Sequence, residues 1–213
     1  MRGTGPNPCG LALAEALLVP SAAAAREWQS ERHNFEVTLP DGADWKIQKN
    51  ADPEIVLSIT HMKDARTFAI AVTREHASVL TDEMMKAGER EFLDGVKRGV
   101  GVQPTKTYGR KLEVRGHPAY EVAGKLTFMG QEMTVLARFF IAGGRVYSLS
   151  LGAAGRDVTA DPELQAMLNS FRFLKAPAIG AAGEAPKRRG LSMWIMVGVL
   201  LGLYVVYRIV RRD

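Results

Sequence analysis

Alternating apolar and polar residues fill the first part of the chain and predict β-strands. In FEVTLP, Phe35, Val37 and Leu39 share one face, and Pro40 ends the segment before a DGAD turn and a short WKIQ strand. The segments EIVLSITH and TFAIAVTR follow, joined by a predicted hairpin connection at residues 63–66. Both segments carry apolar residues on both faces, and this pattern predicts a central sheet that is covered on both sides.

The hydrophobic period changes to between three and four in LTDEMMKAGEREFLDGVKRG, which predicts a helix. Thr81 suits the N-cap position, acidic residues follow in the first turn, and Gly99 is expected to lie just beyond the last helical residue. Leu80 is placed to pack against Met85 across the cap. The apolar positions form one stripe, so we expect this helix to pack on the sheet.

Four more strands are predicted after this helix, between TKTYGRKLEV and RVYSLSLG. Gly116, Met129–Gly130 and Gly143–Gly144 fall where antiparallel strands would turn. A second helix is predicted in TADPELQAMLNSF, with Asp161 as N-cap and Pro162 at the first helical position. The order of three or four strands, a helix, four strands and a helix predicts an α+β fold, an antiparallel β-sheet flanked by α-helices.

An apolar run near the end of the chain predicts one C-terminal transmembrane helix over residues 191–210. Eighteen consecutive uncharged residues extend from Gly190 to Tyr207. As a helix they would be about 27 Å long, close to the thickness of a bilayer core, about 30 Å. The residues expected to anchor the helix at the interfaces are Trp194, Tyr204, Tyr207 and Arg208. The alternative is a buried core helix of a soluble protein.

The first part of the chain, residues 1–25, is typical of a secretory signal peptide. A short apolar stretch and small residues in A-x-A spacing precede Arg26, so cleavage is expected near Ala24 or Ala25. Glu15 interrupts the apolar stretch, and the alternatives are a weak signal, a different start or a disordered Ala-rich leader. The mature chain would contain no cysteine, which fits an exported protein without disulfides.

One domain, residues 26–174, lies between the leader and the membrane span and has the usual size for a complete core. An Ala/Pro/Gly linker with a basic end follows at residues 175–190, and residues 211–213 form a short basic tail. The formal charge is +5, but residues 26–175 hold 21 Lys and Arg against 20 Asp and Glu, a net of +1. The domain therefore lacks the basic face that nucleic-acid binding requires, and we expect no nucleic-acid partner.

The sequence contains no catalytic or cofactor-binding motif that we can recognise. G-x-S-x-G, P-loop and H-E-x-x-H patterns are absent, so we expect no cofactor, no metal and no enzymatic activity. His61 and His76 flank the predicted hairpin and could approach each other, with turn or surface positions as the alternative. Asp41 and Asp44 are interpreted as part of a solvated turn and not as a catalytic pair.

Aromatic residues suggest a second kind of site, an apolar groove between sheet and helix. The residues that could line it are Trp45, Phe92, Phe139, Phe140 and Tyr147, although core packing is the simpler interpretation. Phe139 and Phe140 are adjacent in one predicted strand and therefore face opposite sides of the sheet. Either both faces are covered, or one of these rings is exposed for a partner.

Several short motifs resemble those of the PsbP-like family, which is named for the extrinsic protein of photosystem II and shared with bacterial periplasmic lipoproteins of the DcrB type. The patterns are F-x-V-x-L-P-x-G-W with two residues inserted before the Trp, G-x-P-A-Y, R-x-Y-x-L and S-F-R-F, in this order. The matching residues are Phe35, Val37, Leu39, Pro40, Gly42, Trp45, Gly116, Pro118, Ala119, Tyr120, Arg145, Tyr147, Leu149 and Ser170–Phe173. The resemblance covers residues 30–174 and implies an α/β/α sandwich of a mostly noncatalytic family.

The preferred hypothesis is a membrane-tethered, extracytoplasmic binding or assembly module without catalysis. Its partners would be the lipid bilayer, through the C-terminal helix, and a protein or small ligand, with the domain periplasmic and the C-terminus cytoplasmic. The candidate binding or motif residues are Trp45, His117, Tyr120, Phe140 and Tyr147. One alternative is an envelope hydrolase or transferase, which requires a cleft with a perturbed titratable group. Another is a cytosolic-facing, tail-anchored interaction protein with an uncleaved leader.

Overall fold

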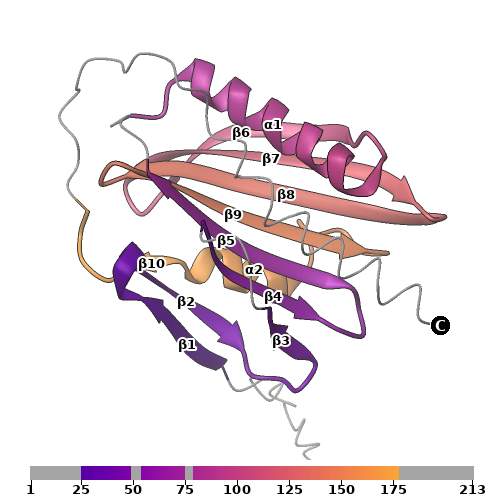
Figure 1. Ribbon diagram of the computed structural model, residues 1–213, viewed down its shortest axis with the longest axis horizontal. Helices are drawn as coiled ribbons and strands as arrows, with labels where there is room; N and C mark the ends of the chain where they lie inside the picture. The colour runs from indigo at the N-terminus through magenta and orange to yellow at the C-terminus, as the bar shows by residue number, and fades with distance from the viewer. Residues whose placement is uncertain (1–24, 49–53, 75–78, 178–213) are drawn as a thin grey trace, which may run out of the picture.

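A computed structural model of the chain describes residues 25–48, 54–74 and 79–177, which form two antiparallel sheets and two α-helices (Figure 1). Along the chain the elements are β1 (Ala25–Ser30), the 3-10 helix η1 (Glu31–His33), β2 (Phe35–Pro40), β3 (Trp45–Ile47), β4 (Ile55–His61), β5 (Arg66–Arg74), α1 (Asp82–Val100), β6 (Thr105–Val114), β7 (His117–Phe128), β8 (Gln131–Ala142), β9 (Arg145–Ala154), α2 (Pro162–Ser170) and β10 (Arg172–Phe173).

The larger sheet has seven strands in the order β3-β4-β5-β9-β8-β7-β6, and all neighbouring pairs are antiparallel. Strands β6 to β9 follow one another through tight turns, as predicted, with positive φ angles at Gly116, Gly130 and Gly143–Gly144. The hairpin between β4 and β5 is also confirmed. Arg66, predicted to lie in the connection, is instead the first residue of β5, because it pairs with both His61 and Ala153.

One face of the larger sheet is covered by α2 and by a second, three-stranded sheet in the order β1-β2-β10 (Figure 1). Asp161 caps α2 and Pro162 is its first residue, as predicted. The second sheet was not predicted. The sequence AREWQS of β1 shows no clear alternation, and this strand owes its place to pairing with β2, where Trp28 lies opposite Val37.

Helix α1 covers the other face of the larger sheet, above β6, β7 and β8 (Figure 1). The side chain of Thr81 accepts a hydrogen bond from the backbone N–H of Met84, which confirms the predicted N-cap. The predicted end at Gly99 was wrong, because Gly101 is the residue in the left-handed conformation (φ 76°). Its N–H bonds to the carbonyl of Lys97 at 2.7 Å, so the helix continues to Val100.

Both faces of the larger sheet are thus covered where the aromatic residues lie. Phe139 packs in the cluster under α1, and its neighbour Phe140 packs in the cluster on the α2 side, each fully buried. The prediction that these two rings face opposite sides is confirmed. Among the described residues, no helix is long and apolar enough to cross a bilayer. The predicted span at residues 191–210 lies outside the described residues, as does the leader up to residue 24.

Candidate functional site

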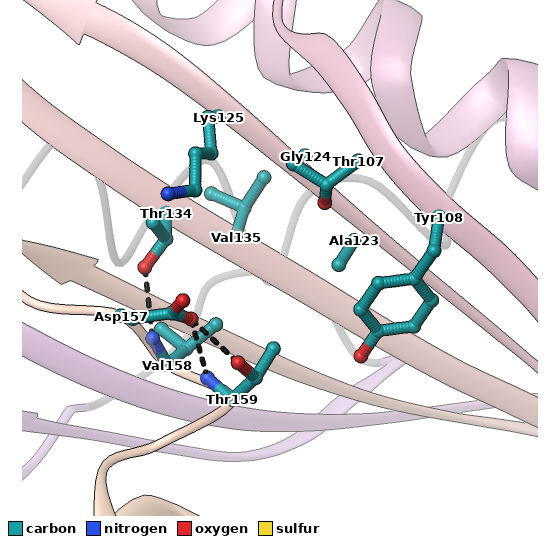
Figure 2. A pocket seen from close by; sticks show the side chains of 10 residues that line it. All are labelled: Thr107, Tyr108, Ala123, Gly124, Lys125, Thr134, Val135, Asp157, Val158 and Thr159. Atoms are coloured by element: carbon teal, nitrogen blue, oxygen red, sulfur yellow. Dashed lines mark hydrogen bonds between the residues drawn. The ribbon is translucent and has the colours of Figure 1, made fainter.

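A pocket of about 140 Å³ opens between strands β6, β7 and β8 and the loop that joins β9 to α2 (Figure 2). Its floor is apolar, with Ala123 and Val158, and its rim is rich in hydroxyl and charged groups. The polar residues that line it are Thr107, Tyr108, Lys125, Thr134, Asp157 and Thr159. An apolar floor with a few polar groups around it is the usual composition of a small-ligand site.

A β-bulge at Thr107 shapes one wall of this pocket. The pairing of β6 with β7 shifts between Lys106 and Tyr108, so Thr107 is an extra residue in the edge strand. Successive residues of a regular strand point to opposite faces, whereas a bulge re-aims a side chain and bends the strand. Thr107 and Tyr108 therefore both line the pocket, although they are consecutive in the sequence.

The opposite wall is a loop held in place by side-chain hydrogen bonds. Oδ1 of Asp157 accepts from the backbone N–H of Thr159 at 2.9 Å and from its hydroxyl at 2.7 Å. These hydrogen bonds hold the pKa of Asp157 below its ordinary value, so the rim carries a carboxylate at neutral pH. The hydroxyl of Thr134 accepts from the N–H of Val158 at 2.9 Å and donates to the carbonyl of Arg156 at 2.6 Å. The wall is therefore tied to β8 before any ligand arrives.

A buried carboxylate with two arginine partners lies behind Tyr108. Glu121 has no solvent-accessible surface. Arg138 donates from Nε and Nη2 to its Oε2 at 2.9 and 2.6 Å, and Arg110 donates from Nε and Nη2 to its Oε1 at 2.9 and 2.6 Å. The hydroxyl of Tyr108 donates to Oε1 at 3.1 Å. Arg138 also reaches Asn169 of α2 at 3.1 Å, so this network joins three strands to a helix.

The network fixes the protonation states beside the pocket. Burial alone would raise the pKa of Glu121, but the hydrogen bonds and charges of Arg138 and Arg110 outweigh it and hold the pKa below its ordinary value. Burial, together with the nearby Glu121 charge, raises the pKa of Tyr108 to about 12. At neutral pH the carboxyl is therefore ionised and the phenol is protonated. Neither group suits proton transfer to or from a ligand, and the phenol proton is already donated to Glu121.

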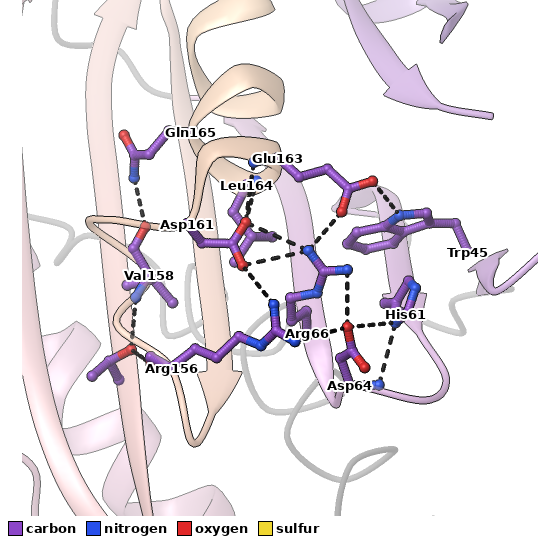
Figure 3. A network of polar contacts seen from close by, with 11 residues as sticks. Trp45, His61, Asp64, Arg66, Arg156, Val158, Asp161, Glu163, Leu164 and Gln165 are labelled. Carbon is purple, nitrogen blue, oxygen red and sulfur yellow. Dashed lines mark hydrogen bonds and ion pairs between the residues drawn. The ribbon is translucent and has the colours of Figure 1, made fainter. Parts of the chain in front are cut away.

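A second polar network ties the beginning of α2 to the β3–β5 end of the sheet (Figure 3). Arg66 is almost fully buried, and its guanidinium contacts Glu163 at 2.6 Å, Asp64 at 3.2 Å and Asp161 at 3.4 Å. It also lies 5.1 Å from the ring centroid of Trp45, whose Nε1 donates to Glu163 at 3.0 Å. This network fastens α2 to the sheet.

The predicted binding residues lie in three different places. Trp45 belongs to the network around Arg66. His117, Phe140 and Tyr147 meet around Phe173, at ring distances of 5.3, 6.2 and 5.4 Å, and lie in the buried core or at its border. His117 is the first residue of β7, directly after the turn at Gly116.

Tyr120, the fifth predicted binding residue, points to the α1 side. Its hydroxyl donates to Oε2 of Glu89 at 2.5 Å, and burial together with this carboxylate raises its pKa to about 12. None of the five residues lines the pocket of Figure 2. The predicted anchor residues Trp194, Tyr204, Tyr207 and Arg208 lie outside the described residues.

Sequence reasoning missed the polar pocket because its residues are common types on ordinary strands. The one local signal was the Asp157-Val158-Thr159 sequence, since an aspartate followed two residues later by a hydroxyl often forms a tight loop. The bulge at Thr107 is a property of strand pairing and leaves no mark in a single sequence. In the described part of the chain, no three His, Cys, Asp or Glu residues gather where they could hold a metal ion. Nδ1 of His61 accepts from the N–H of Asp64, and His76 lies outside that part.

Comparisons with known proteins support the fold. No protein-family model and no curated protein matches the sequence. The solution structure of CyanoP, the cyanobacterial PsbP of Synechocystis sp. PCC 6803, aligns with a TM-score of 0.58 and 12% identity, over 78% of this chain and 99% of CyanoP. LpqN of Mycobacterium tuberculosis, a protein involved in cell envelope biogenesis, aligns with a TM-score of 0.39 and 17% identity, over 68% of this chain and 85% of LpqN.

The comparison with CyanoP assigns a PsbP-like fold to the domain, as the short motifs had indicated. Nearly all of CyanoP is matched, so the likeness extends over the whole of that protein. The likeness to LpqN is too distant to carry an argument. At 12% identity the comparison with CyanoP establishes a common fold alone, and the function has to be argued from the residues themselves.

Proposed function

We propose that this chain is a membrane-tethered, extracytoplasmic module whose PsbP-like domain binds a small polar ligand without converting it. The observation that carries the proposal is the pocket of Figure 2, where hydroxyls and charges surround an apolar floor. The ionised Asp157 supplies an acceptor, and the Tyr108 hydroxyl, whose proton is donated to Glu121, can accept a hydrogen bond from a ligand. Lys125 adds a positive charge on the same rim.

The chemistry of the pocket favours recognition over catalysis. A general base needs a pKa near neutrality, whereas the pKa of Tyr108 is about 12 and that of Asp157 lies below the ordinary aspartate value. The arginines next to the pocket are committed to Glu121. A small ligand with acceptors for Lys125 and the hydroxyls or with donors for Asp157, such as a carboxylate, phosphate, sugar or amine, matches this rim.

The membrane tether is proposed from the sequence. Eighteen uncharged residues, Gly190–Tyr207, are long enough to cross a bilayer and are flanked by basic residues on both sides. The linker before them is short, and a flexible chain of its length spans on average about 20 Å. The domain would then stay near the lipid surface, with residues 211–213 in the cytoplasm.

Topology is the first test of this proposal. The full-length chain is expressed in a bacterium with an inner and an outer membrane, its mature N-terminus is determined by mass spectrometry, and protease is added to spheroplasts. We expect a start near Ala25 and digestion of the domain. An intact Met1 with a protected domain would overturn the export proposal. Replacing Leu200 and Leu201 by lysine is the control, and it should release the domain from the membrane fraction because charges at the bilayer centre are costly.

Ligand binding is tested on the same full chain in detergent micelles by thermal shift, with small carboxylates, phosphates, sugars and amines as probes. A probe that raises the melting temperature of the wild type should lose most of its effect in Thr159→Val and Lys125→Gln. Thr127→Val is the matched control, since Thr127 is exposed on the same strand β7 and does not line the pocket. If no probe acts, or if all three variants respond like the wild type, this pocket is not the binding site.

A further inference from the structure

Three neighbouring strands carry small or hydroxyl-bearing side chains on the α1 side of the larger sheet. On β4, β5 and β9 these positions alternate with large apolar residues such as Leu57, Phe68 and Leu149, which join the core cluster on the α2 side. Alternate residues of a strand face opposite sides, so the small residues face the side of α1. We call them the small-residue face: Ser58, Thr60, Thr67, Ala69, Ala71, Thr73, Ser148 and Ser150. All eight are buried.

Two hydroxyls of this face have no hydrogen-bond partner. Oγ of Ser58 and Oγ1 of Thr60 are fully shielded from solvent, and nothing accepts from them or donates to them. A hydroxyl that is permanently buried without a partner loses the hydrogen bonds it makes with water. A permanent core would place apolar groups at these positions. Hydroxyls suit a surface that is covered in one state and wet in another.

On the α1 side of the larger sheet, helix α1 does not extend over the small-residue face. It lies above β6 to β8 in Figure 1, and within the described ranges no other helix or strand packs over β4 and β5 on the same side. One flank of α1 reaches β6 and β7, where Glu89 contacts Lys106. The opposite flank, which carries Glu91 and the buried Gly95, therefore turns toward β9 and β5. A glycine there leaves room for something to pack beside the helix.

The chain itself supplies an occupant of suitable size. The described residues end at Pro177, whose Cβ lies 3.5 Å from where a Cβ on Gly143 would be, so the chain leaves at the turn where β9 begins. Thirty-six residues follow, including the uncharged run Gly190–Tyr207. As a helix that run is about 27 Å long. Strand β5 has nine residues and is about 30 Å long, so the two lengths match.

We propose that the apolar segment Gly190–Tyr207 docks on the small-residue face whenever it is not inserted in a bilayer, so that the domain shields its own membrane anchor. Gly198 and Gly202 are four residues apart in the sequence and would lie one turn apart if the segment is helical, and small residues on both partners allow the close approach seen between membrane helices. The unpaired hydroxyls keep the docked state weak, so a bilayer can withdraw the segment. This inference rests on the proposed membrane tether.

Cross-linking of the full chain tests the docking. In a Cys9→Ser background, Ala71→Cys on β5 is combined with Val199→Cys in the segment, and a short bismaleimide is added at low protein concentration without detergent. We expect an intramolecular cross-link. Adding vesicles of phosphatidylethanolamine and phosphatidylglycerol should lower its yield by about tenfold, the shift expected when insertion is favoured over docking by one order of magnitude. Thr107→Cys with Val199→Cys is the control and should not react, because Thr107 is on the exposed edge strand β6.

The outcomes separate the docking from the tether. Vesicle binding without any cross-link in water overturns the docking and leaves the tether standing. A cross-link in water without vesicle binding supports the docking and overturns the tether. A product of doubled mass would assign the face to a second copy of the chain and overturn the proposal. The double variant Gly198→Leu with Gly202→Leu leaves the sequence of the domain unchanged. It should lower the cross-link yield severalfold while vesicle binding persists.

Discussion

Strand β5 presents Phe68, Ile70 and Val72 to one side of the larger sheet, and Ala69 and Ala71 to the other. The same alternation of large and small residues runs through β4 and β9. On the first side, α2 and the second sheet pack against the strands and complete a core within the described residues. On the second side, the small-residue face combines small side chains with unpaired hydroxyls. The comparison separates a permanent core from a face that suits a removable cover.

We call the α2 side of the larger sheet the permanent side. A cluster of aromatic rings in mutual contact holds its elements together. Phe140 stacks on Tyr147 with centroids 5.4 Å apart and planes 8° from parallel, and Phe171 meets both rings edge-on. Phe35 of the second sheet stacks on Phe171 at 5.4 Å. These contacts join strands, helix end and second sheet, so no element on this side can leave without opening the core.

Truncating the centre of this cluster should have the largest effect. Phe140→Ala removes a fully buried ring that contacts three others, and we expect it to lower the free energy of unfolding by about 3–5 kcal/mol. Urea unfolding followed by circular dichroism measures this loss. Ala71→Gly on the small-residue face is the comparison, and it should cost about 1 kcal/mol or less. Similar losses for both variants would remove the distinction between the two sides.

The next largest effect is expected at the polar network on the same side. Glu121→Ala leaves Arg138 buried with Asn169 as its remaining partner, and we expect a loss of about 3 kcal/mol, the lower end for a broken buried ion pair because Arg110 can turn to water. Urea unfolding again measures the change. In the double variant Glu121→Leu with Arg138→Met much of the loss should return, since no unpaired charge is then buried. A double variant no better than Glu121→Ala would contradict this account.

Low pH should reduce the free energy of unfolding, because Glu121 on the permanent side becomes protonated. Its pKa is lower in the folded chain than in the unfolded chain, so the unfolded chain binds more protons between the two values. The stabilisation is therefore complete above the ordinary glutamate value, about 4.3, and is lost as the pH falls through the folded pKa. Glu121→Gln should be less stable at neutral pH and should lose less stability in acid than the wild type. Parallel stability curves for the two proteins would show that Glu121 does not contribute to the acid sensitivity.

The sequence predicted most of the regular structure because short-range physics determines it. Alternation identified β2, runs with apolar residues on both faces identified β4 and β5, and the caps at Thr81 and Asp161 identified the two helix starts. Features that depend on pairing between distant segments were not predictable. Strand β1 forms because it pairs with β2, and the bulge at Thr107 results from the way β6 pairs with β7.

The candidate pocket escaped prediction for a related reason. The predicted residues were aromatic, since aromatic rings stand out in a sequence, and the fold uses Phe140 and Tyr147 to fill the core. The pocket instead combines hydroxyls from strands with a loop that follows β9. Phe139 and Phe140 did predict correctly that both faces of the sheet are covered. The difference between the two faces is seen only when β4, β5 and β9 lie side by side, with their large residues on one face and their small residues on the other.

The smallest expected effect is on the free energy of unfolding of two Thr→Val variants, and its sign differs between the two sides of the larger sheet. Thr134 faces the permanent side and its hydroxyl makes two hydrogen bonds, so Thr134→Val should cost about 1–2 kcal/mol. Thr60 is equally shielded but its hydroxyl has no partner, so Thr60→Val in the full chain without membranes should leave the free energy of unfolding unchanged or raise it by up to about 1 kcal/mol. Urea unfolding of both variants under identical conditions measures the difference. A cost at Thr60 equal to that at Thr134 would mean that the Thr60 hydroxyl is hydrogen-bonded, and the small-residue face would then be an ordinary polar core with no reason to open.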